Sequence, residues 1–88
     1  MDTNFDQLLD FPCQQNFKIM GLAHERFPQD VISCLQVHAP GNYDEPKVKP
    51  SSKGTYHSIS LSITVTSKAH METLYVELAK LELVKVVL

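Results

Sequence analysis

The chain has 88 residues, of which 43% are hydrophobic and 20% charged, and its formal net charge is −2. This length allows one domain over residues 1–88 with a single core, and the composition is too apolar for a disordered chain. No apolar run approaches the ~20 residues that a membrane-spanning helix needs, so we expect no membrane insertion.

The charge is unevenly spread along the chain. Residues 1–45 carry seven acids and two bases, whereas residues 46–88 carry six bases and three acids. The basic excess begins at Lys47, Lys49 and Lys53, and three lysines are a weak field for a protein that binds nucleic acid by neutralising phosphates. The acidic start MDTNFDQLLDF lacks the basic residues of a secretory signal, so we expect a cytoplasmic protein.

The two cysteines give no support for metal ligation or for a disulfide framework. Cys13 and Cys34 are twenty-one residues apart, and the sequence has no Cys-x-x-Cys pair. We therefore expect no metal site, no disulfide framework and no cofactor.

The first elements are a short helical turn, a strand and a helix. Phe5, Leu8 and Leu9 have helical spacing within residues 4–11, and residues 16–21 alternate as a strand does. A helical stripe follows, formed by Phe27, Val31, Cys34, Leu35 and His38. Pro28 suits the first turn of that helix, and Pro40 with Gly41 ends it.

A second strand and a turn come next. Residues 47–49 form a short strand, and Pro50 places it at a sheet edge because proline cannot donate to a ladder. Residues 51–54 supply the turn, in which Gly54 is the natural residue for a positive φ.

Residues 55–66 give the clearest strand pattern in the chain. One face carries His57, Ile59, Leu61, Ile63 and Val65, and the other carries Tyr56, Ser58, Ser60, Ser62, Thr64 and Thr66. Such alternation predicts one buried and one open face.

The remaining elements complete a βαββαβ order, the ferredoxin-like plan of the α+β class, with a four-stranded antiparallel sheet and two helices on one face. Ser67 caps the second helix, whose inward stripe is Met71, Leu74, Tyr75 and Leu78, and residues 83–88 form the last strand. We expect the first and third strands in the middle. The open face should also carry Lys18, Met20, Leu83, Lys85 and Val87.

Three segments resemble the YbeD-like bacterial proteins, a family of unassigned function. They are HAPGNY, VKPSSKGTYHSISLSI and METLYVELAKLELVKVVL. The resemblance covers nearly the whole chain, from LLDFP to Leu88. It implies a ferredoxin-like fold similar to ACT-type regulatory domains, which bind small effectors at interfaces between paired domains, and it implies no catalytic activity.

The loop KPSSKG is either a ligand cradle or the turn before a strand. A phosphate loop leads into a helix, whereas a strand follows here, which favours the turn. Backbone N–H groups and a lysine could still bind an anion. The candidate ligand- or partner-binding residues are Ser51, Ser52, Lys53, Gly54, Tyr56 and His57. The alternation of the strand places His57 on the core side. It would be either a packing residue or a ligand-facing imidazole at the rim of the sheet.

Catalysis and RNA binding both lack a signature. Ser51, Ser52, His57 and Asp44 have no spacing that enforces a nucleophile–base pair, and Cys34 points inward, so we expect no enzyme. RNA-recognition modules carry K/R-G-F/Y-G/A-F-V-x-F/Y on their third strand, and only the Lys-Gly pair matches here. We therefore do not expect nucleic acid as the main partner.

We interpret the chain as a non-enzymatic regulatory or adaptor module that binds a small anionic metabolite or a protein. The binding rim would combine residues 50–58 with the helix-end loop 39–44. The alternative is a pure protein-interaction module that acts through the open face or the last strand. Pairing at that edge would give a homodimer, unless the C-terminus is frayed or covered. Weak nucleic-acid binding is a further alternative.

Overall fold

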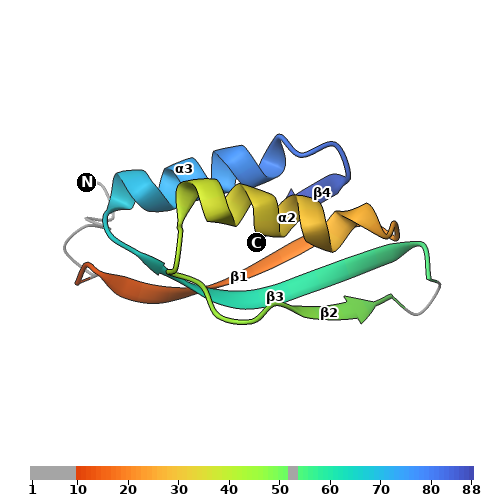
Figure 1. Ribbon diagram of the computed structural model, residues 1–88, viewed down its shortest axis with the longest axis horizontal. Helices are drawn as coiled ribbons and strands as arrows, with labels where there is room; N and C mark the ends of the chain where they lie inside the picture. Colours follow the sequence, from red (N-terminus) through yellow and green to blue (C-terminus); the bar gives the residue numbers. More distant parts are fainter. Residues whose placement is uncertain (1–9, 52–53) are drawn as a thin grey trace, which may run out of the picture.

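A computed structural model describes residues 10–51 and 54–88. Figure 1 shows both helices of this part of the chain on one side of a sheet. The elements are β1 (Cys13–Leu22), α2 (Arg26–His38), β2 (Lys47–Pro50), β3 (Tyr56–Val65), α3 (Lys68–Ala79) and β4 (Val84–Val87). The predicted βαββαβ fold is confirmed, while most of the helical turn expected at 4–11 lies outside the described residues.

The sheet has the strand order β2-β3-β1-β4, with every neighbouring pair antiparallel. The first and third strands are therefore central, as predicted. They pair over their whole length, from Cys13 opposite Val65 to Leu22 opposite Tyr56. β1 begins at Cys13, three residues earlier than the sequence indicates. The polar residues Gln14 and Gln15 near its start interrupt the alternation of polar and apolar side chains that marks a strand.

The core lies between the sheet and the two helices. The odd-numbered positions of β3 from Ile59 to Val65 are all buried, while the even-numbered positions are not. This confirms the two faces predicted from the alternation. The other fully buried large side chains are Phe17, Ile19, Phe27, Val31, Leu35, Leu74 and Leu78. Tyr75, expected inward, is 37% exposed, with its ring tilted against Phe17 at a centroid distance of 4.9 Å.

One histidine joins the end of α2 to the start of α3. Ser67 caps α3 as predicted, since its Oγ accepts the His70 N–H at 3.0 Å. The His70 ring accepts the Thr66 N–H at Nδ1 (3.0 Å), so its proton lies on Nε2, which donates to the His38 carbonyl oxygen at 2.7 Å. This ring therefore connects the start of α3 to the end of α2.

The last strand does not have the predicted parity. The register shifts at Met20–Gly21, so that Met20 lies opposite Val86 and Gly21 opposite Val84. One extra residue in a strand turns the following side chains to the other face. Val86 therefore joins Met20 on the open face, whereas Leu83 is buried and Val87 packs against the core. The expectation of Leu83 and Val87 on the open face was wrong.

The chain remains paired to its last residue. Leu88 and Lys18 exchange two backbone hydrogen bonds of 2.7 and 3.0 Å. The end of the chain is thus docked on β1, which excludes the frayed terminus that we kept as an alternative.

Candidate functional site

The described ends of the predicted loop are held together between β2 and β3, and we call this connection the turn. Gly54 has φ +72°, as its position in the sequence predicts. The Ser51 N–H donates to the Tyr56 carbonyl oxygen at 2.8 Å, and Ser51 Oγ accepts the Tyr56 N–H at 3.3 Å. Ser51 thus holds the turn with both backbone and side chain. Ser52 and Lys53 lie outside the described residues.

A hollow of about 290 Å³ lies beside this turn, on the sheet face opposite the helices. Its lining residues are Lys18, Met20, Lys49, Pro50, Ser51, Tyr56, His57 and Ser58. The structure therefore brings Ser51, Tyr56 and His57 of the predicted set together, and it adds two lysines from neighbouring strands. We call this the turn hollow.

The positions in the turn hollow are not equivalent. Tyr56 is 41% exposed and lies on the open face, opposite Leu22. His57 lies opposite Gly21 and Pro50, and strand alternation turns its side chain toward the helix layer. His57 is half-buried, in agreement with the predicted core-side position.

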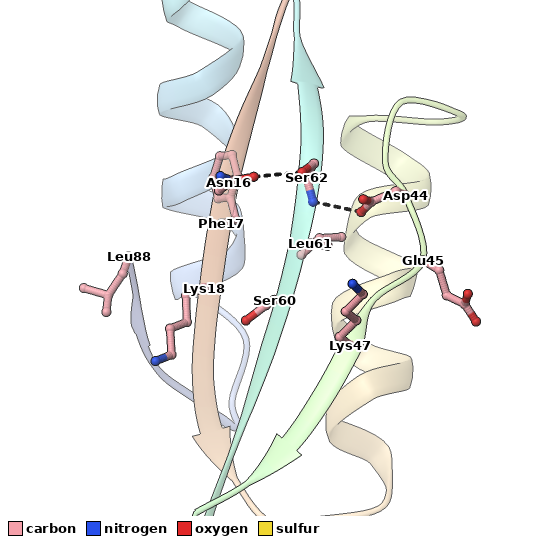
Figure 2. Close-up of a pocket in the computed structure, with 10 residues that line it drawn as sticks. All are labelled: Asn16, Phe17, Lys18, Asp44, Glu45, Lys47, Ser60, Leu61, Ser62 and Leu88. Carbon is pink, nitrogen blue, oxygen red and sulfur yellow. Dashed lines mark hydrogen bonds between the residues drawn. The ribbon is translucent and has the colours of Figure 1, made fainter.

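A second hollow, of about 400 Å³, lies further along the same face. Figure 2 shows the ten residues that line it: Asn16, Phe17, Lys18, Asp44, Glu45, Lys47, Ser60, Leu61, Ser62 and Leu88. Ser62 Oγ donates to Asn16 Oδ1 at 2.8 Å, and the Ser62 N–H donates to Asp44 Oδ1 at the same distance. We call this the central hollow. Lys18 borders both hollows.

Three lysines gather on this face around the serines of β3. The register places Lys18 and Lys47 on either side of Ser60, and Lys49 beside Ser58. Within residues 10–51 and 54–88, the ion pairs are Arg26–Glu82, His38–Glu77 and Lys80–Glu77, so none includes these three lysines. In the sequence, Lys47 and Lys49 are visible only as a charge excess, and no local pattern shows that they lie beside Lys18.

The loop at 39–44 does not adjoin the turn, contrary to our expectation. Tyr43 forms a bridge with Ile63, and the Asn42 carbonyl oxygen accepts the Thr64 N–H. These contacts lie at the far end of β3 from Tyr56. The chain leaves α2 above that end and runs the length of the sheet edge before the turn, as Figure 1 shows. The prediction that residues 50–58 and 39–44 form one binding rim was therefore wrong.

Within the described residues, Asp44 does not join Ser51 and His57, with which it was considered from the sequence. The Asp44 carboxylate binds the Ser62 N–H, at the other end of β3 from Ser51 and His57. Burial raises the pKa of the Cys34 thiol, and the Glu77 carboxylate raises it further, which makes this thiol a poor nucleophile. The described residues also contain no cluster of three or more side chains suited to a metal ion. Neither described helix is long and apolar enough to span a bilayer.

The element order and the strand order define an α+β domain of the ferredoxin-like type. Residues 6–88 match the family model described as "Protein of unknown function (DUF493)", and the chain belongs to this family. A UPF0250 protein of Shewanella baltica strain OS155 is 54% identical over 88 residues, which are 100% of this chain and 99% of the relative. A UPF0250 protein of Idiomarina loihiensis is also 54% identical, over 98% and 97% of the two chains. The resemblance to YbeD-like proteins is thereby confirmed.

Solved structures share the fold at low sequence identity. The ACT domain from the GTP pyrophosphokinase of Chlorobium tepidum has a TM-score of 0.69 at 17% identity, over 85% of this chain and 94% of that one. The solution structure of HP0495 from Helicobacter pylori has a TM-score of 0.71 at 13% identity, over 100% and 94%. Identities this low establish the fold alone.

Proposed function

We propose that this protein is a non-enzymatic regulatory module of the cytoplasm that binds a small anionic metabolite on its open sheet face. The observation that supports it is the cluster of Lys18, Lys49 and the hydroxyls of the turn hollow, to which no described carboxylate is paired. The fold supports it too, because one structural neighbour is an ACT domain of a GTP pyrophosphokinase.

In the turn hollow, the ligand would meet charge and hydroxyl groups from three strands. Lys49 from β2 and Lys18 from β1 supply the ammonium groups, and Tyr56 from β3 supplies a phenol at the rim. Charged hydrogen bonds of this kind are stronger than neutral ones. Ser51 contributes by fixing the turn, since its Oγ already accepts the Tyr56 N–H.

The proposal can be tested by titrating the labelled protein with a panel of anionic metabolites and recording amide shifts by NMR. Binding should perturb the amides of Tyr56 and Ser58, and a Lys49→Ala variant should weaken it. Lys68→Ala is the matched control, because Lys68 is also exposed but lies at the start of α3. A panel that leaves every amide of the open face unmoved would exclude this function.

A second candidate function, protein interaction through the β4 edge, is supported by a difference between the two sheet edges. Hydrogen-bonded pairs alternate along an antiparallel ladder, and Ser51 bonds to Tyr56, so the backbone of Pro50 faces outward from β2. Pro46, four residues before Pro50, also faces outward by this alternation. Neither proline has an N–H that could donate a hydrogen bond. Leu88 bonds to Lys18, so Val87 turns its N–H and C=O away from β1. The β4 edge is thus the better equipped for strand addition.

Sedimentation velocity over a range of concentrations would test this second function. Val87→Pro removes the outward N–H, while Val87→Ala removes a similar packing contact and keeps that N–H. Self-association through β4 should survive Val87→Ala and be lost in Val87→Pro. If the wild type sediments as a monomer at every concentration, pairing of two copies at this edge is excluded.

A further inference from the structure

One row of the central hollow places a hydroxyl between two ammonium groups. Ser60 is paired with Lys18 on β1 and with Lys47 on β2. Side chains paired across neighbouring strands lie on the same face of a sheet. Figure 2 shows both lysines on the near side of the sheet, with Ser60 on the strand between them.

Ser60 is distinguished from the neighbouring serines by its available hydroxyl. Ser58 Oγ donates to the Lys49 carbonyl oxygen at 3.4 Å, and Ser62 Oγ donates to Asn16 Oδ1 at 2.8 Å. Among the described residues, no hydrogen bond includes the hydroxyl of Ser60, whose residue is exposed. This hydroxyl can therefore donate to a ligand without giving up a bond within the protein.

The acidic residues that border the central hollow leave its lysines without an ion pair. Asp44 Oδ1 accepts the Ser62 N–H, which directs this carboxylate to the backbone of β3. Glu45 extends away from the hollow in Figure 2. Lys18 and Lys47 carry positive charges on the same sheet face and repel each other. An anion placed above Ser60 would be attracted by both and would reduce this repulsion.

We propose that the central hollow is a second anion position, centred on Ser60, and that the ligand of this protein carries two anionic groups. One group would lie between Lys18 and Lys47, and the other beside Lys49 and Tyr56 in the turn hollow. Lys47 and Lys49 are two residues apart on β2, which puts the two positions ~7 Å apart. Met20, which lines the turn hollow, offers an apolar surface to the linker. This inference rests on the proposed function, because it identifies the class of its ligand.

Linear carboxylates provide a direct test. Pimelate is a dicarboxylate long enough to reach both positions when extended, heptanoate has the same chain with a single carboxylate, and glutarate has two carboxylates on a shorter chain. Each would be titrated into wild-type protein at low and moderate salt, with the Ser60 and Tyr56 amides followed by NMR. Pimelate should bind more tightly than heptanoate or glutarate and should move both amides.

The variants separate the two positions. Lys47→Ala should weaken pimelate binding by about 1.5- to 5-fold, the range for one exposed ion pair, and leave heptanoate binding unchanged. Lys49→Ala should weaken the binding of both pimelate and heptanoate, and Lys68→Ala should change the binding of neither. Moderate salt should reduce the advantage of pimelate, because exposed charges are screened.

Four results would overturn this inference, and three of them spare the proposed function. If heptanoate binds as tightly as pimelate, or if Lys47→Ala has no effect while Lys49→Ala does, the ligand uses the turn hollow alone. If glutarate matches pimelate, charge alone decides and the two positions are not bridged. If neither these carboxylates nor the metabolite panel perturbs the open face, the inference and the proposed function both fail.

Discussion

Phe27, at the start of α2, packs directly over the Cα of Gly21 in β1. A β-carbon built on Gly21 would lie 2.6 Å from Phe27 Cε1 and 2.5 Å from the Leu83 carbonyl oxygen. Real β-carbons do not approach other atoms this closely. The absence of a side chain at Gly21 therefore lets the helix, β1 and the segment before β4 meet at one point, at the end of the sheet that bears the turn hollow.

Gly21→Ala should destabilise the protein. In an ordinary strand position alanine would stabilise by about 0.5–1 kcal/mol relative to glycine, but here overpacking against a backbone oxygen should cost about 1–3 kcal/mol. Urea denaturation of the wild type and the variant measures the difference. Gly54→Ala is a useful comparison, since Gly54 has open space around it and only its φ of +72° opposes a side chain. An unchanged or higher midpoint for Gly21→Ala would show that the helix can move aside at no cost.

His70→Ala should loosen the connection between the two helices. The ring accepts the exposed Thr66 N–H and donates to the partly buried His38 carbonyl oxygen, so alanine would remove two hydrogen bonds. The expected loss is about 1–3 kcal/mol in the free energy of unfolding, measured in urea.

His24→Ala is the matched control for this histidine. His24 is exposed, and its Nδ1 accepts a single backbone N–H, from Arg26 at 3.0 Å. Its replacement should cost less than that of His70, within about 1 kcal/mol. Equal losses for both variants would mean that the bridge from α3 to α2 contributes nothing beyond a local helix contact.

The sequence predicted the two faces of β3 because a single long strand shows its period directly. Nothing interrupts the alternation from Ile59 to Val65, and the same parity, carried across the sheet, places Lys18 on the open face. The parity of β4 could not be obtained in this way. The extra residue at Lys85 is visible only in the register between β4 and β1, and β4, with three valines and one lysine, has too few polar positions to reveal the shift.

The basic cluster was within reach of the sequence, whereas the position of the loop was not. Lys47 and Lys49 share one face of a strand, and the expected strand order puts that strand beside β3. The register of those pairs then joins them to Lys18 through Ser60. The position of the loop at 39–44 depends on where α2 ends above the sheet. The contact of Tyr43 with Ile63 is a tertiary one that no local pattern indicates.

Cys34 should react slowly with iodoacetamide in the folded protein. Its raised pKa, caused first by burial and then by Glu77, leaves less thiolate at pH 8, and the thiolate is the reacting form. A Cys13→Ser variant isolates this thiol. Mass spectrometry should show slower alkylation in buffer than in urea, and Glu77→Gln should speed the reaction in buffer.

The same thiol gives the protein a pH dependence at the alkaline end. Because the folded state holds the Cys34 proton more tightly, this contribution to stability is complete below the pKa of the unfolded chain and is lost as the pH rises through the folded pKa. Replacing Cys34 by alanine should therefore flatten the alkaline decline in stability. An alkylation rate equal in buffer and in urea would contradict both expectations.

Asp44→Ala should release the loop that leads from α2 to β2. Asp44 Oδ1 accepts the Ser62 N–H at 2.8 Å, and the Asp44 N–H donates to the Ser62 carbonyl oxygen at 3.0 Å, so this residue fastens the loop to β3 from both sides. Alanine keeps the backbone bond and removes the carboxylate, at an expected cost of about 1 kcal/mol at this exposed position. Asp44→Asn should cost less, because the amide oxygen can still accept.

Glu45→Ala serves as the control for charge, because the neighbouring carboxylate extends away from the sheet. It should change the free energy of unfolding by less than about 0.5 kcal/mol. Equal destabilisation by Asp44→Ala and Glu45→Ala would show that the negative charge of the loop matters and the bond to Ser62 does not.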